Sequence, residues 1–148
     1  MTIDDRRVLI AGGGPVGLLC AWLLGRRGVP VRLFDDNDSP QADPRAATTH
    51  PATLDLLRED GLAQDMARVG LVAPIFQFWD RPSGEKVAEF DHAILKDDTH
   101  HPFVVQCEQF KTAKLILERL HKFSNVEVLF GHERLRTRSR HSVRRRPF

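Results

Sequence analysis

The fold is decided by one stretch near the N-terminus, RVLIAGGGPVG at residues 7–17. Its first part, residues 7–11, is a nearly continuous apolar run closed by glycines, which is typical of a parallel strand buried on both faces. Helical spacing follows over residues 15–27, and a second strand is predicted at residues 30–34. The apolar face of the helix is expected to comprise Val16, Leu19, Cys20, Leu23 and Leu24. A strand, a helix and a strand within so few residues predict a βαβ unit with parallel strands and a right-handed crossover.

The turn between the first strand and the helix carries the strongest functional signal. Its glycines at positions 12, 14 and 17 fit the pattern G-x-G-x-x-G at a strand-to-helix junction. The first glycine permits a tight turn, the second lets the backbone touch a pyrophosphate, and the third lets the helix close onto the strand. A turn that binds nothing is the alternative, but it needs only one glycine. The sequence thus predicts a dinucleotide site at Gly12, Gly13, Gly14, Pro15, Val16 and Gly17, with the helix N-terminus facing the phosphates.

A carboxylate, Asp35, ends the second strand about 20 residues beyond the motif, where it can accept hydrogen bonds from the adenosine ribose. The alternative is that Asp35 only begins a polar turn, because four of residues 35–39 are Asp or Asn. A carboxylate at this position disfavours a 2′-phosphate, so NADP is not expected there. FAD and NAD both remain as candidates.

The rest of the chain indicates an α/β fold. Helices are expected at residues 51–60, with Thr49 or His50 as N-cap, then before Gly70, and at 109–123; strands are expected at 71–79, 85–90 and 126–130. The turn Arg81-Pro82-Ser83-Gly84 indicates a hairpin. We therefore predict a Rossmann-like parallel sheet with flanking helices and a small antiparallel hairpin over residues 5–133. Residues 134–148 hold seven arginines and no acidic residue, and we expect this tail to be disordered or to arise from a frameshift.

Composition narrows the class of protein. A chain of 148 residues suits one domain, and its apolar runs fall short of the roughly 18 to 20 residues that span a bilayer. Cys20 and Cys107 stand far apart and suggest buried, reduced thiols in a soluble cytoplasmic protein. The basic tail could serve as a nucleic-acid arm, but it lacks interleaved aromatic residues and any known binding module, so nucleic acid is not the expected partner.

Other polar and aromatic residues are not assigned to sites. His92, His100 and His101 lie near several aspartates, yet their spacing matches no zinc or facial-triad site, so no metal is predicted. No nucleophile pattern is present, and no residue is assigned a catalytic role. Trp22 and Trp79 are expected to be packing residues.

Several ordered segments together resemble one family, the class A flavoprotein monooxygenases of the para-hydroxybenzoate and phenol hydroxylase type. The resemblance is carried by residues 8–18, 26–31, 44–46, 53–58, 104–106, 115–120 and 126–133. It implies FAD as the bound dinucleotide, with Asp35 at the place of a ribose-binding Glu. It also implies that Arg45 reaches the FAD phosphates or the flavin edge and that Gln106 contacts the cofactor at the mouth of its helix. Without the resemblance, Arg45 would be an exposed loop residue and Gln106 a polar helix cap.

Two departures from the family limit what the resemblance implies. Ala52 stands where many relatives carry Arg. The family's second flavin-contacting segment and substrate-binding sheet usually follow the strand that ends here near Phe130, and neither is present. Complete members use NAD(P)H and oxygen to hydroxylate aromatic substrates on bound FAD. We therefore expect an FAD-binding fragment of such an enzyme that is inactive alone. A fragment of an NAD-dependent dehydrogenase is one alternative, although it predicts a short βα repeat after Phe34; a non-catalytic nucleotide-binding or interaction fragment is another.

Overall fold

A three-stranded parallel sheet forms the base of the molecule. The structure, a computed structural model, describes residues 6–42 and 46–132. The sheet consists of β1 (Val8–Ala11), β2 (Val31–Phe34) and β8 (Val126–Leu129), in the order β1-β2-β8. Val31 of β2 pairs with Val8 on one side and Val126 on the other. The βαβ unit is confirmed, and the strand expected at residues 126–130 is the third strand of this sheet.

Two helices, α1 (Pro15–Gly25) and α4 (Gln109–Leu120), lie side by side on one face of this sheet. Val31 and Leu33 of β2 are fully buried beneath them. The opposite face is more open, and Leu9 on β1 is 63% exposed. The prediction that the first strand is buried on both faces is therefore wrong, because within the described part β1 is an edge strand covered on one side only.

The buried face of α1 also differs from the predicted one. Its fully buried residues are Leu18, Ala21, Trp22 and Gly25, which follow helical spacing. Val16 is 83% exposed and Cys20 is exposed as well, so neither belongs to the core and only Cys107 is a buried thiol. The reason is that residues 18–24 are all apolar. Their pattern therefore does not distinguish the face that packs on α4 and the sheet.

A second sheet was not predicted from the sequence. It joins β3 (Thr48–Thr49), β7 (Val104–Gln106) and β4 (Leu71–Ala73) in the antiparallel order β3-β7-β4. Between β3 and β4 lie α2 (Pro51–Leu56), capped by His50, and α3 (Leu62–Val69). The helix expected to reach residue 60 ends four residues earlier, and α3 buries Leu62, Ala63 and Met66.

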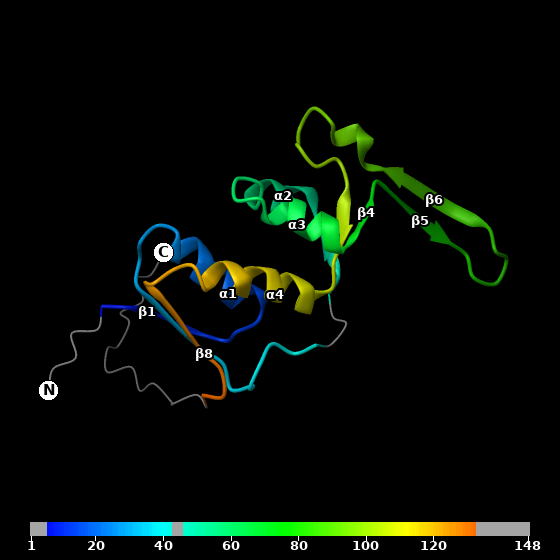
Figure 1. Ribbon diagram of the computed structural model, residues 1–148. Helices are drawn as coiled ribbons and strands as arrows, with labels where there is room; N and C mark the ends of the chain where they lie inside the picture. Colours follow the sequence, from blue (N-terminus) through cyan, green and yellow to red (C-terminus); the bar gives the residue numbers. More distant parts are fainter. Residues whose placement is uncertain (1–5, 43–45, 133–148) are drawn as a thin grey trace, which may run out of the picture.

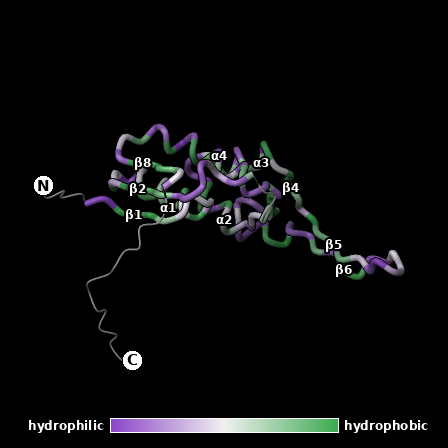
Figure 2. Tube along the Cα trace, turned by 90° about the horizontal axis from the view of Figure 1, so that it is seen from below, coloured by the Kyte–Doolittle hydropathy of each residue, from purple (hydrophilic) through white to green (hydrophobic). Residues whose placement is uncertain are grey.

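The hairpin consists of β5 (Ile75–Trp79) and β6 (Lys86–Asp91), followed by the 3₁₀ turn η1 (His92–Leu95). It is confirmed, but it projects from the body instead of lying beside the parallel sheet (Figure 1). Viewed from below, its strands are partly apolar although they reach away from the other elements (Figure 2). The expected strand over residues 71–79 is divided by Pro74 into two strands of different sheets. Trp79, expected to be a packing residue, is exposed.

The hydrophobic core lies where α1, α3 and α4 meet β2 and β7. Its members are Leu18, Ala21, Trp22, Val31, Leu33, Leu54, Leu57, Leu62, Ala63, Met66, Val105, Cys107, Ala113, Ile116 and Leu120. Among the described residues, no helix has both the length and the apolar character that a membrane crossing requires. The Arg-rich segment predicted to begin at residue 134 lies outside the described residues.

Candidate dinucleotide site

The Gly-rich turn joins the end of β1 to the start of α1, and its geometry depends on glycine at three positions. Gly12 has a φ of 110° and donates its N–H to the Phe34 carbonyl at 2.7 Å. A Cβ at Gly17 would collide with the Gly12 carbonyl oxygen. A Cβ at Gly13 would come within 2.9 Å of the Phe130 ring. These contacts hold the turn close to the ends of β2 and β8.

Gly14 differs from Gly13 and Gly17, where an added Cβ would meet other atoms. It is the N-cap residue of α1, and a Cβ built on it meets no atom within 4 Å. The space in front of the helix N-terminus is therefore open, although the turn behind it is tightly packed. Pro15 follows at the first helical position, where a missing N–H costs nothing. The first-turn N–H groups of a helix lack intrahelical partners, so this opening suits an anionic group.

Asp35 lies at the end of β2, and its carboxylate is tied to the Gly-rich turn. Its Oδ2 accepts the Gly13 N–H at 2.5 Å. Its Oδ1 accepts the backbone N–H of Asn37 at 2.9 Å and the Asn37 side-chain amide at 2.7 Å. Asp35 thus begins a polar turn and also stands beside the glycines. The turn contacts of Asp35 are therefore present, and its place beside the glycines is the one that ribose binding requires.

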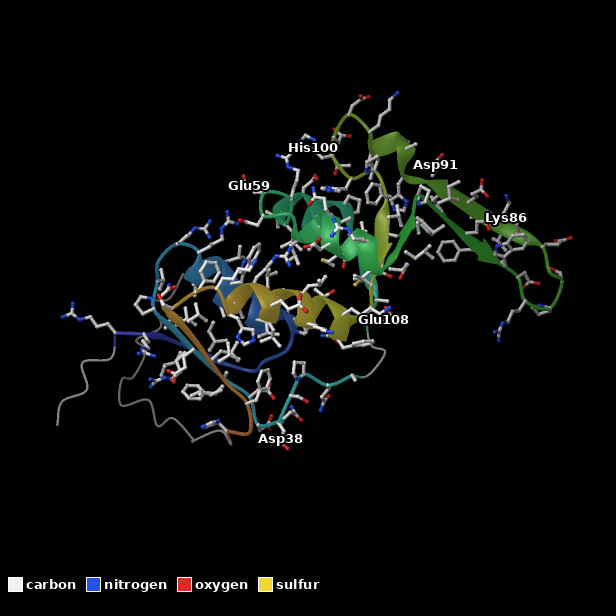
Figure 3. All side chains as sticks on the ribbon, viewed as in Figure 1. Asp38, Glu59, Lys86, Asp91, His100 and Glu108 are labelled. Carbon is white, nitrogen blue, oxygen red and sulfur yellow. The ribbon has the colours of Figure 1, made fainter. Side chains whose placement is uncertain are left out.

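A pocket of about 150 Å³ opens between these groups and α4. It is lined by the turn (Gly13, Gly14, Pro15), by Asp35, by the loop after β2 (Asn37, Ser39, Pro40, Gln41) and by the first turns of α4 (Gln109, Phe110, Ala113). Figure 3 places Asp38 on that loop and Glu108 at the start of α4, the two segments that face each other here. Ligand pockets usually measure about 300 to 1,000 Å³. This one fits only part of a dinucleotide.

The residues that line this pocket determine which groups could balance the negative charge of a bound pyrophosphate. None of its described lining residues is cationic. A bound pyrophosphate would therefore depend on the N-terminus of α1, where the helix dipole places partial positive charge. An additional cation would have to come from another segment, and Arg45, the arginine predicted for this role, lies outside the described residues.

Gln106 does not cap a helix, which was the alternative to its predicted contact with the cofactor. It ends β7, and its Oε1 accepts the Thr48 hydroxyl at 2.8 Å. The N-cap of α4 is Glu108. Gln106 does not line the pocket, although it lies only three residues before Gln109, which does. The register of Thr48 opposite Gln106 also brings the segment that follows residue 45 alongside β7.

Sequence reasoning missed the wall that α4 contributes. Gln109, Phe110 and Ala113 were expected on a helix, but nothing in their spacing indicates that this helix begins opposite the Gly-rich turn. Asn37 and Gln41 stood within an expected loop, and Gln41 is held there by its contact with Asn37 at 3.0 Å. Only the packing of α4 against α1 brings these groups to one pocket.

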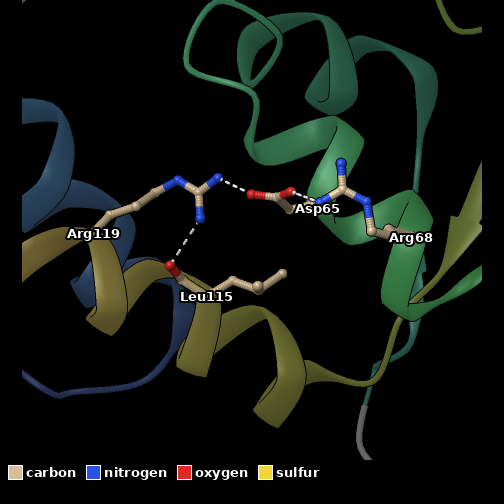
Figure 4. Close-up of polar contacts among 4 residues, drawn as sticks. All are labelled: Asp65, Arg68, Leu115 and Arg119. Carbon is tan, nitrogen blue, oxygen red and sulfur yellow. Dashed lines mark hydrogen bonds and ion pairs between the residues drawn. The ribbon is translucent and has the colours of Figure 1, made fainter.

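Two polar networks lie outside the pocket and link other elements of the fold. Asp65 on α3 accepts hydrogen bonds from Arg119 of α4 and from Arg68, and Arg119 also donates to the Leu115 carbonyl (Figure 4). The Arg119 hydrogen bond lowers the pKa of Asp65 most strongly, with a further contribution from the charge of Arg68. The second network joins Asp55 of α2 to Thr99 and His101.

Comparison with known proteins gives consistent matches. A family model described as an FAD binding domain matches residues 5–145. The para-nitrophenol 4-monooxygenase of Pseudomonas sp. (strain WBC-3) is 33% identical over 131 residues, which is 88% of this chain and 32% of that protein. The crystal structure of p-nitrophenol 4-monooxygenase PnpA from Pseudomonas putida DLL-E4 superposes with a TM-score of 0.80 and 34% identity over 85% of this chain and 32% of that one.

A third match includes the cofactor. The flavin-dependent monooxygenase PieE, solved in complex with FAD and substrate, has a TM-score of 0.73 and 26% identity over 89% of this chain and 25% of its own. This chain thus spans about a third or less of the relatives it matches. The resemblance inferred from the sequence is confirmed, as are the α/β fold and FAD as the dinucleotide of the matched family.

Proposed function

Since this chain belongs to the family of FAD-binding domains found in aromatic-ring monooxygenases, we propose that it holds the ADP half of FAD in such an enzyme. The whole protein would hydroxylate a phenolic substrate with NAD(P)H and oxygen. When bound, FAD would supply the oxygen chemistry. The described residues would bind and orient it, and none is assigned a catalytic role.

One observation carries the proposal: the carboxylate of Asp35 and the open N-terminus of α1 border the same pocket. The Asp35 carboxylate accepts hydrogen bonds from Gly13 and Asn37. A ribose hydroxyl would replace one of the Asn37 donors at this carboxylate. The pyrophosphate would lie over Gly14, where a side chain is absent and the backbone is accessible.

The other end of the cofactor is assigned to Arg45 and Gln106. Arg45 would reach the phosphates or the flavin edge, and Gln106 would contact the cofactor beyond the pocket. The antiparallel pairing of β3 with β7 supports this assignment, because it holds the segment just after Arg45 beside Gln106. A dinucleotide extending from Asp35 past the start of α4 would continue toward Gln106, which ends β7 three residues before Gln109.

The site is tested by titrating FAD, ADP and NAD into the wild type and into Asp35→Ala, Gly14→Val and Asp38→Ala by calorimetry. Removing a charged acceptor costs about 1.5 to 3 kcal/mol per hydrogen bond, so Asp35→Ala should bind FAD and ADP about tenfold or more weakly. Gly14→Val should abolish binding, because its side chain fills the open space. Asp38→Ala is the matched control, since Asp38 is exposed on the same loop and does not line the pocket.

Two outcomes would contradict the proposal. Unchanged binding by Asp35→Ala would mean that Asp35 is only a turn residue, and a preference for NAD over FAD would remove the flavoprotein assignment. A separate assay follows NAD(P)H oxidation with FAD and a panel of phenols. We expect no substrate-dependent turnover from this chain alone, because it spans only about a third of the matched enzymes.

A further inference from the structure

A buried polar contact joins α2 to the segment that precedes β7. His101 is 8% exposed and is the only buried polar or charged residue in the described part of the chain. Its Nδ1 lies 2.7 Å from Oδ1 of Asp55 on α2. The ring of Phe103 packs edge-on against the imidazole, with 5.6 Å between the ring centroids. The imidazole is thus fixed by one carboxylate and one aromatic ring.

Thr99 also contacts Asp55, and we refer to Asp55, Thr99 and His101 together as the clasp. The Thr99 hydroxyl donates to Oδ2 of Asp55 at 2.6 Å and accepts the backbone N–H of His101 at 3.0 Å. Both carboxylate oxygens are therefore used. The hydrogen bonds from Thr99 and then His101 lower the pKa of Asp55, so the carboxylate is held in its charged form.

The clasp connects the chain just after β3 with the chain just before β7. It therefore joins the same two segments as the β3–β7 pairing does. β3 is followed at once by His50 and α2, and His101 comes shortly before β7. The ladder itself is small, because β3 has only two residues. Two hydrogen bonds flank it. The Cys107 N–H donates to the Ala47 carbonyl at 2.7 Å, and the Thr48 hydroxyl donates to Oε1 of Gln106 at 2.8 Å. Strands this short have little stability of their own, so the clasp stabilises their register.

We infer that Asp55 and His101 are positioning residues for the flavin-side end of the cofactor site, because they hold the β3–β7 ladder that carries Gln106. This inference rests on the proposed function. The ADP end is built on other elements, namely β1, β2 and the N-terminus of α1. Loss of the clasp should therefore weaken FAD binding and leave ADP binding intact, a separation that general destabilisation does not produce.

The experiment compares FAD and ADP affinities of the full 148-residue chain with those of His101→Ala, His101→Asn and Asp65→Asn. His101→Ala should bind FAD about tenfold more weakly, a loss of about 1.4 kcal/mol, with ADP affinity within about twofold of the wild type. His101→Asn should recover most of the FAD affinity, because its amide nitrogen occupies the place of Nδ1. Asp65→Asn is the matched control: Asp65 is also a half-buried helical carboxylate with two partners, but it lies outside the clasp.

Equal weakening of FAD and ADP in His101→Ala would overturn the inference in favour of a general structural role, and unchanged FAD affinity would overturn it as well. If the wild type binds neither ligand, the proposed function fails, and amide hydrogen exchange decides the positioning role instead. The Cys107 amide should exchange at least about tenfold faster in His101→Ala than in Asp65→Asn, because local opening of the ladder exposes it. Equal rates in the two variants would refute the positioning role.

Discussion

The parallel sheet and the β5–β6 hairpin are both made of apolar strands, yet they are stabilised in different ways. In β2, Val31 and Leu33 are completely buried beneath α1 and α4. In the hairpin, Phe76 stacks on Phe90 at 4.8 Å between centroids, and Phe78 lies edge-on to both. All three rings remain exposed. The hairpin side chains therefore pack on one another, whereas those of the sheet pack on a second layer.

This difference separates two levels of stability within one chain. A two-stranded hairpin that packs on no second layer is marginal in water, and its aromatic contacts offset only part of the cost of ordering it. The sheet and its helices share one hydrophobic core, which gives them cooperative stability. Equivalent substitutions in the two regions should thus have unequal effects on the free energy of unfolding.

The largest contrast is expected between two glycine substitutions. In Gly17→Ala, the new methyl group would collide with the Gly12 carbonyl oxygen. We expect a loss of more than about 4 kcal/mol, which few single substitutions reach, and little folded protein. In Gly84→Ala, the methyl group enters open space and only the φ of 72° is strained, a local cost of about 1 to 2 kcal/mol. Circular dichroism during urea unfolding measures both, and equal stabilities would show that α1 packs more loosely on β1.

The next contrast is between two large apolar side chains. Leu33→Ala should destabilise the protein by about 2 to 5 kcal/mol, because it leaves a cavity in the core. Phe78→Ala removes an exposed ring, so global stability should change by less than about 1 kcal/mol. The urea midpoints of the two variants give the comparison. A similar loss in both would mean that the hairpin unfolds cooperatively with the core.

The smallest contrast concerns acid. The pKa of Asp65 is lowered by Arg119, and that of Glu89 in the hairpin is lowered by Lys86 and Gln77. A carboxyl with a lowered folded pKa contributes stability above its unfolded pKa and loses it as the pH falls through the lower, folded value. Asp65→Asn should therefore reduce the acid sensitivity of unfolding. Glu89→Gln should reduce it less, because solvent screens the exposed hairpin pair; urea titrations at neutral and acidic pH compare the two variants.

The sequence contained enough information for the βαβ unit because its signals are local. Three glycines at fixed offsets, a closed apolar run and a terminal carboxylate predict β1, α1 and β2 without reference to the rest of the chain. Periodicity failed for β3, β4 and β7, because strands of two or three residues complete too few alternations to be recognised. It also failed for the buried face of α1, where nearly every residue is apolar.

The candidate site was predictable to a similar degree. Gly13, Gly14 and Asp35 do lie together, because a βαβ unit brings the first turn beside the end of its second strand. Gln106 was expected at the mouth of a helix because β7 was not anticipated. The α4 wall of the pocket faces residues 68 to 100 positions away in the sequence, and no pattern within α4 encodes this arrangement.

The two tryptophans of this chain fall one in each region, and the sequence has no tyrosine. Trp22 is 2% exposed beneath the guanidinium of Arg26, whereas Trp79 is 56% exposed and donates its indole N–H to Gln77. The fluorescence of the two tryptophans should therefore differ in wavelength and in accessibility to quenchers. Trp22 should emit at shorter wavelength and resist aqueous quenchers, while Trp79 should emit at longer wavelength and be quenched readily. The molecule thus contains one optical reporter for its core and another for its hairpin, without any added label.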